Sequence, residues 1–156
     1  MQENYINCYK TARQHAGFTQ ERWAELIGVS TESVRLYESG KSLPSDEVVT
    51  RMVEMSMLPA LAYKHLMLKS SIAADILPEV PDMPLPQAVI KLICCMRDFE
   101  EKHRDQDLMH IAMDGRVDAK EEGLFEEIVD ELENVIQAAM TVKFAKEGRH
   151  ENIGRN

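Results

Sequence analysis

The chain has 156 residues, of which 44% are hydrophobic and 29% are charged, and its net charge is −9. This length suits one or two small domains, and no apolar run reaches the roughly eighteen residues of a membrane span. The acidic charge excludes a strongly basic nucleic-acid-binding protein, but it lies mostly in the second half. Residues 1–57 carry six Lys or Arg against eight Asp or Glu, so this nearly neutral half could bind DNA if its cations share one face.

The N-terminus, "MQENYINCYK", is polar and does not resemble a secretory signal, so we expect a cytoplasmic protein. Cys8, Cys94 and Cys95 lack CxxC spacing, which indicates reduced thiols rather than a disulfide framework or a zinc site. The histidines are scattered and form no ligand pattern. We therefore predict neither a metal nor a cofactor.

Capping residues and glycines predict five short helices before a proline-rich segment. Thr19 and Ser45 are suited to cap the second and fourth helices, and Gly28 tolerates the left-handed backbone at a helix end. The expected helices cover roughly residues 4–16, 19–28, 30–40, 45–55 and 59–69. No alternating strand pattern is present, so the sequence predicts an all-α fold.

A tight "GVS" turn joins the second and third helices. On a helical wheel, Val34 and Tyr37 face inward, whereas Thr31, Arg35 and Leu36 belong to a mostly polar outer face. Two short helices arranged in this way have the geometry of a helix-turn-helix, whose second helix enters the major groove of DNA.

Residues 18–41, "FTQERWAELIGVSTESVRLYESGK", resemble the helix-turn-helix of the lambda-repressor-like (Xre/Cro) family of DNA-binding regulators. The shared elements are Thr19-Gln20, Trp23-Ala24, Gly28-Val29-Ser30 and Glu38-Ser39-Gly40. Trp23 stands where the family usually has Leu, and it still supplies apolar bulk. The resemblance covers about the first sixty residues and implies a five-helix DNA-binding domain that binds double-stranded DNA.

The resemblance also assigns roles to individual residues. Gln20 falls where the family contacts phosphate or an edge base, and Lys41 falls where it touches phosphate. Arg13 matches an arginine that pairs with the position of Glu38, a structural ion pair. Arg35 could reach guanine or pair with a neighbouring glutamate. The predicted DNA-binding residues are Gln20, Ser30, Thr31, Glu32, Arg35, Leu36, Ser39 and Lys41.

The segment "LPEVPDMPLP", residues 77–86, contains four prolines and cannot be helical throughout. Two long amphipathic segments follow it, the second opening with a capping box formed by Asp118 and Glu121. We expect a DNA-binding domain in residues 1–70, a linker in 71–86, a helical hairpin in 87–146 and a flexible tail in 147–156. The wide apolar stripes of the hairpin predict a homodimer that forms a four-helix bundle.

The second half has a weaker similarity to prophage-associated members of the same group, which suggests a host-encoded or phage-derived regulator. The sequence around Asp114 and Asp118 matches the back half of an EF-hand loop, but His110 and Ala112 occupy early ligand positions, which argues against calcium binding.

Two alternatives to a DNA-binding repressor remain at this stage. The first domain could be a protein-interaction module without strong DNA affinity, as an antitoxin or an antirepressor target would be. An enzyme built on the acidic clusters is disfavoured, because no acid–base constellation has a suitable spacing. The operator and any protein effector of the second domain cannot be deduced from the sequence.

Overall fold

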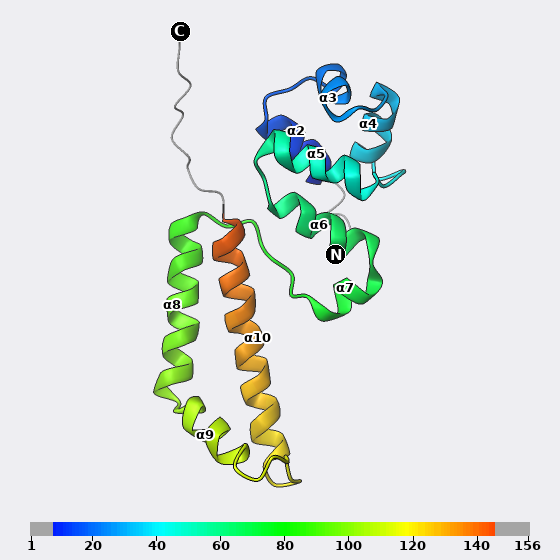
Figure 1. Ribbon diagram of the computed structural model, residues 1–156. Coiled ribbons are helices and arrows are strands. Elements are labelled where there is room, and N and C mark those ends of the chain that lie inside the picture. The colour runs from blue at the N-terminus through cyan, green and yellow to red at the C-terminus, as the bar shows by residue number, and fades with distance from the viewer. Residues whose placement is uncertain (1–7, 146–156) are drawn as a thin grey trace. The chain divides into compact units, whose positions relative to one another are not determined.

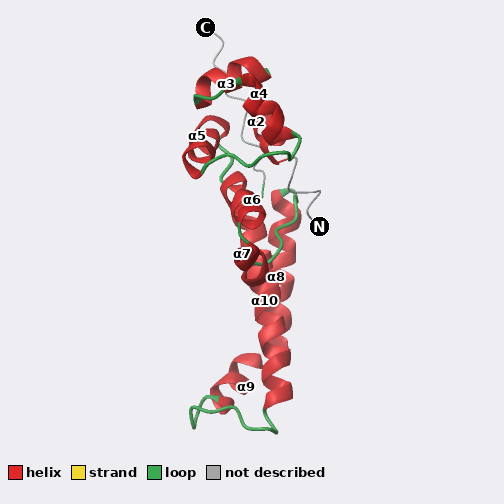
Figure 2. Ribbon diagram, turned by 90° about the vertical axis from the view of Figure 1, so that its right-hand side faces the viewer, coloured by secondary structure: helices red, strands yellow, loops and turns green. Residues whose placement is uncertain are grey.

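The computed structural model describes residues 8–145, and in this range it contains helices but no strands (Figures 1 and 2). The all-α prediction is therefore confirmed. The chain divides into two compact units, one ending at Leu77 and the other beginning at Pro78. Within residues 8–145, no helix combines the length and the apolar character that crossing a bilayer requires.

The first unit contains the predicted short helices and one more. They are α2 (Cys8–His15), α3 (Gln20–Ile27), α4 (Thr31–Glu38), α5 (Asp46–Ser56), α6 (Ala60–Lys69) and α7 (Ser71–Ile76). Residues 4–7 of the first predicted helix lie outside the described residues. Thr19 and Ser45 cap α3 and α5 as expected, because their hydroxyls accept hydrogen bonds from backbone N–H groups three residues later.

The assignment of residues 71–86 to a linker was wrong at both ends. At the start, the hydroxyl of Ser70 accepts a 3.2 Å hydrogen bond from the backbone N–H of Ala73 and so caps α7. At the other end, the next helix begins at Leu85, with Pro86 in its first turn, where a missing N–H costs nothing. The connector between helices is therefore only residues 77–84.

The core of the first unit is built around Trp23, which is fully buried. Its ring stacks on Phe18, with 5.9 Å between the centroids. The other core residues come from all the helices between α2 and α6: Cys8, Tyr9, Ala12, Ala24, Ile27, Val34, Val48, Val49, Met52 and Leu61. The indole thus fills the core position for which the sequence pattern predicts apolar bulk.

A chain of polar contacts runs from this core to the surface, where the side chain of Asp46 is 70% exposed. The hydroxyl of Tyr9 lies 2.8 Å from Nδ1 of His65, whose Nε2 lies 3.1 Å from Oδ1 of Asp46. Lys69 donates to the same carboxylate oxygen at 2.6 Å. The hydrogen bonds from Lys69 and His65 lower the pKa of Asp46, so α2, α5 and α6 are joined through an ionised carboxylate. Burial raises the pKa of the neighbouring Cys8 thiol to about 12, which keeps it protonated.

The second unit is a hairpin of two long helices with a short helix at its tip. Its elements are α8 (Leu85–Glu101), α9 (Arg104–Ile111) and α10 (Glu122–Phe144). The sequence did not predict α9 as a separate helix. The predicted capping box does form: the backbone N–H of Asp118 donates to Glu121, and that of Glu121 donates to Asp118, at 3.1 and 3.0 Å. It lies in the turn just before α10.

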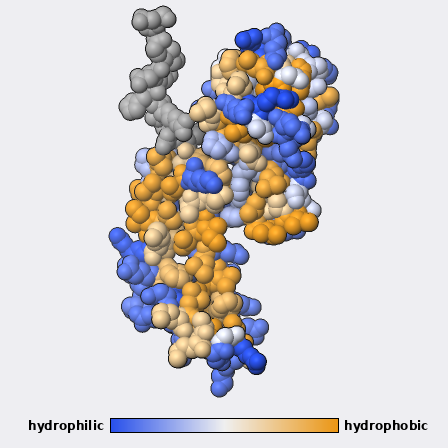
Figure 3. All heavy atoms as spheres, viewed as in Figure 1, coloured by the Kyte–Doolittle hydropathy of each residue, from blue (hydrophilic) through white to orange (hydrophobic). Residues whose placement is uncertain are grey.

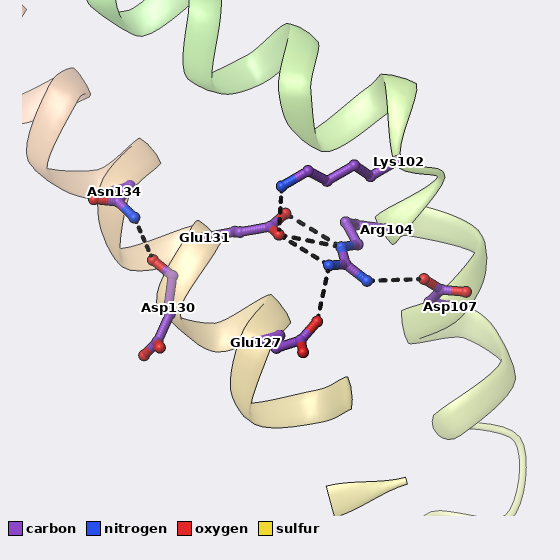
Figure 4. A network of polar contacts seen from close by, with 7 residues as sticks. All are labelled: Lys102, Arg104, Asp107, Glu127, Asp130, Glu131 and Asn134. Carbon is purple, nitrogen blue, oxygen red and sulfur yellow. Dashed lines mark hydrogen bonds and ion pairs between the residues drawn. The ribbon is translucent and has the colours of Figure 1, made fainter. Parts of the chain in front are cut away.

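Figure 4 shows how α9 is held against α10. The guanidinium of Arg104 contacts Glu131 at 3.0 Å, Glu127 at 3.2 Å and Asp107 at 3.4 Å, and Lys102 reaches Glu131 at 3.0 Å. These donors lower the pKa of Glu131, with the hydrogen bond from Arg104 as the main cause. A single guanidinium therefore links the tip of the hairpin to its second long helix.

The turn after α3 generates a first prediction. Gly28 has φ of +72°, a conformation that costs a residue with a Cβ about 1–2 kcal/mol. Gly28→Ala should lower the free energy of unfolding of the first unit by that amount, although no atom would clash with the added methyl. Trp23 is the only tryptophan, so its fluorescence during urea unfolding measures this unit.

The matched control is Gly123→Ala in α10, where a methyl meets nothing within 4 Å and φ is helical. This substitution should leave the Trp23 transition unchanged. Equal midpoints for Gly28→Ala and the wild-type chain would show that the left-handed turn is not required.

Candidate nucleic-acid interface

Helices α3 and α4 are joined by a turn that closes on itself. The backbone N–H of Val29 donates to the carbonyl of Ala24 at 3.0 Å, while Gly28 adopts the left-handed conformation predicted for it. The hydroxyl of Ser30 then caps α4 by accepting a 3.0 Å hydrogen bond from the backbone N–H of Ser33. Together, the turn at Gly28 and the cap at Ser30 fix the start of α4 and its direction.

Helix α4 buries one side and presents the other. Val34 is buried in the core, and Tyr37 packs against it. Glu32 and Arg35 are exposed, and Thr31 and Leu36 are half-buried. The outer face is therefore short and mostly polar, with one aliphatic side chain at Leu36.

The carboxylate of Glu38, at the end of α4, binds two other helices. Arg13 of α2 contacts both its oxygens and forms a fork-like ion pair, with 3.1 Å between Nη2 and Oε2. The same arginine donates to the carbonyl of Phe18 at 2.8 Å. The side chains of Arg13 and Glu38 are only 12% and 7% exposed. This pair raises the pKa of Arg13, with the hydrogen bond to Glu38 as the largest cause.

Gln20, at the start of α3, is the third member of this cluster. Its amide nitrogen donates to Oε2 of Glu38 at 2.8 Å. The sequence placed Gln20 at the DNA but did not indicate this contact, because the partners are 18 positions apart. An amide has two N–H groups, so one remains for an external acceptor while the other fixes the side chain.

Two of the predicted DNA-binding serines make internal hydrogen bonds. Ser30 uses its hydroxyl for the cap and also lies 2.8 Å from the hydroxyl of Ser33. Ser39 donates to the carbonyl of Leu36 at 3.1 Å. A Ser followed by a helical segment is a capping signal, so the role of Ser30 at the helix start could have been derived from the sequence.

The cations of this surface have acidic neighbours. Arg35 contacts Glu32 at 3.5 Å, and Arg22 contacts Glu25 at 2.8 Å, all four side chains being more than half exposed. Exposed pairs of this kind are worth less than about 1 kcal/mol, so a phosphate or a base could replace the glutamate. Lys41 is exposed beyond the end of α4.

Between residues 8 and 145, no three His, Cys, Asp or Glu side chains gather into a metal-binding group. In the loop that resembles an EF-hand, Oδ1 of Asp114 accepts from the backbone N–H of Arg116 and so closes a turn.

The Glu38 cluster leads to a second prediction. Glu38→Gln leaves the guanidinium of Arg13 without a counter-charge in a largely buried site, which should cost the first unit about 2–3 kcal/mol. Glu25→Gln removes the same charge from an exposed pair and should cost less than about 0.5 kcal/mol. Urea unfolding followed by Trp23 fluorescence compares the two variants. Similar losses would mean that the Arg13–Glu38 pair has no special structural role.

Residues 10–55 match a helix-turn-helix family model, and this range holds α3, the turn, α4 and the Glu38 cluster. No curated protein and no solved structure matches the chain significantly. Residues 10–55 of the chain are therefore similar to a helix-turn-helix domain, which suggests a DNA-binding regulator.

Proposed function

We propose that this protein is a cytoplasmic, sequence-specific DNA-binding repressor that acts as a homodimer and reads the major groove with α4. The observation that carries this proposal is the helix-turn-helix itself. Its second helix has a polar outer face and is braced at its end by the Arg13–Glu38 pair, within a segment that matches a helix-turn-helix family model.

The outer face of α4 offers a mixed set of base contacts. Arg35 could release Glu32 and donate both its terminal nitrogens to guanine. Thr31 could bond a base edge or touch a thymine methyl, and Leu36 offers an apolar contact. Glu32 would accept from cytosine, and it would also disfavour any register that brings it close to a phosphate. Such a face would bind DNA of arbitrary sequence weakly and would select the sequences whose base edges fit these side chains.

Phosphate contacts would fix the position of α4. Lys41 lies just past its end, and the free N–H of the Gln20 amide lies at the start of α3, where the positive end of the helix dipole favours an anion. Because Glu38 holds the other N–H of Gln20, the same carboxylate that braces α4 would also orient a phosphate contact. The position of the protein along the DNA and the orientation of α4 would then depend on the same carboxylate.

The hairpin supports the dimer part of the proposal. Lys91 bonds Gln137 and Lys102 bonds Glu131, so α8 and α10 run antiparallel. Their mutual contacts leave large side chains uncovered: Ile93 and Met96 of α8 are 52% and 55% exposed, and Ile136 of α10 is 52% exposed.

These exposed side chains belong to two stripes on one face of the hairpin. In α8, Val89, Ile93 and Met96 lie roughly a quarter turn around the helix from the buried Ala88. In α10, Val129, Leu132 and Ile136 are displaced from the buried Ile128 by a similar angle in the same sense. For antiparallel helices, the same sense puts both stripes on the same side. Figure 3 shows hydrophobic residues along both long helices.

A two-helix apolar face is half of a four-helix bundle. We infer that a second copy supplies the other half, because a face that repeats in each copy can pair with itself about a two-fold axis. A dimer of this kind would present two helix-turn-helix units to two half-sites.

The DNA contacts are tested with a duplex selected from random sequences. Lys41→Ala should weaken binding to all duplexes and reduce the slope of log K against log salt by about one. Thr31→Ala should weaken binding to the selected duplex about 5- to 100-fold while leaving weak non-specific binding unchanged. Lys120→Ala, which removes an exposed cation from the second unit, is the charge control and should bind normally. A chain that shifts no DNA but captures a protein partner would favour the interaction-module alternative.

The dimer is tested by sedimentation velocity over a range of concentrations. Ile93→Glu places a charge on the apolar face of both copies and should raise the dimer dissociation constant at least about a hundredfold. Gln87→Glu adds the same charge on the polar side of α8 and should leave the dimer intact. A wild-type chain that sediments as a monomer at every concentration would contradict the proposed dimer.

A further inference from the structure

An open groove lies between α5 and α6 in the first unit, on residues that take no part in the proposed DNA contacts. Its volume is about 630 Å³, within the range of ligand-binding clefts. Its surface is mostly apolar and comes from Val49, Val53, Ala62 and Leu66, while polar residues, among them Thr50 and Glu54, complete the lining. Leu66 is 46% exposed although it points into this apolar setting.

Helix α7, in the same unit, has an exposed apolar face. None of its six residues is buried. Ile72 and Ile76 are 69% and 74% exposed, and at a spacing of four residues they lie on one face. Hydrophobic atoms cover the surface over α7 in Figure 3. Helix α7 contacts α6 within the same unit, but the face with Ile72 and Ile76 stays exposed.

The groove and the helix lie next to each other along the chain. Lys69 and Ser70 line one end of the groove, and Ser70 is also the cap of α7. The extended backbone of Ser70, with φ of −124° and ψ of +113°, breaks the path between α6 and α7. In each copy, therefore, an apolar recess ends where an exposed apolar helix begins.

We propose that α7 of a second copy occupies this groove, and that the exchange is reciprocal. Ile72 and Ile76 are the anchors, and Val53 and Leu66 of the second copy receive them. An interface in which each copy supplies the same helix and the same recess closes about a two-fold axis. The occupant is a second copy because the chain itself holds both complementary surfaces.

This inference rests on the proposed hairpin dimer. Two isoleucines in each direction are too few to hold two proteins together from free solution, but a dimer already joined through α8 and α10 makes the exchange intramolecular. Eight residues, 77–84, separate α7 from α8, and an extended segment of that length reaches roughly 25 Å. The exchange would pin the two helix-turn-helix units at one spacing, which two half-sites on DNA require.

Disulfide cross-linking tests the exchange in the full chain, with Cys94→Ser and Cys95→Ser in all variants and the buried Cys8 retained. One chain carries Ile72→Cys and a size tag, and a co-expressed chain carries Leu66→Cys. The mixed disulfide dimer on a non-reducing gel should exceed that of the matched control at least about tenfold. The control replaces Ile72→Cys by Ala74→Cys, which lies on the opposite face of α7.

Two further measurements make the result decisive. A single chain with both Ile72→Cys and Leu66→Cys that cross-links to itself would show that α7 folds onto its own groove, which overturns the exchange. If the mixed cross-link does not form, sedimentation of the Cys94→Ser/Cys95→Ser chain shows whether the exchange or the dimer is wrong. A dimer without the mixed cross-link overturns the exchange alone, whereas a monomer overturns the proposed hairpin dimer and the exchange with it.

Discussion

The carboxylate of Glu38 is the constraint on which the helix-turn-helix depends. Helix α4 has eight residues, far fewer than an isolated helix needs for stability in water, and Val34 is its only fully buried side chain. Its orientation therefore comes from its ends: the Ser30 cap after the Gly28 turn at one end, and Glu38 between Arg13 and Gln20 at the other. Because both partners of Glu38 come from other helices, α4 cannot rotate without breaking buried, charge-assisted hydrogen bonds.

The net charge of −9 is compatible with a DNA-binding surface because of where the acids lie. Glu32 and Glu25 neutralise Arg35 and Arg22 in exposed pairs that contribute little stability. In a specific complex, DNA phosphates would displace these glutamates. In a non-specific encounter, the glutamates and the arginines would both lie close to the phosphates. In the proposed complex, affinity for arbitrary sequences would stay low, and specific binding would need α4 in a register that lets DNA groups replace Glu32 and Glu25.

Local signals account for what the sequence predicted correctly. Thr19, Gly28 and Ser45 act on backbone groups within a few residues, so the helix boundaries they set can be derived without the fold. The predictions failed for features that depend on residues far away in the sequence. Helix α9 is anchored by Arg104 to Glu131, 27 positions away, and Gln20 is bound by Glu38. Helix α7 was missed because the proline-rich stretch after it dominated the local pattern and concealed the cap at Ser70.

Both units leave apolar surface exposed within one copy, and a second copy of the chain is the proposed partner of each surface. The two exposed isoleucines of α7 are too few to hold two copies together from free solution, whereas the hairpin carries a longer apolar face on two helices. Once two copies are joined through the hairpin face, the short, proline-stiffened connector would raise the effective concentration for the contact between α7 and the groove. The hairpin face would then determine whether the protein is a dimer, while α7 and its groove would determine how far apart the two recognition helices are held.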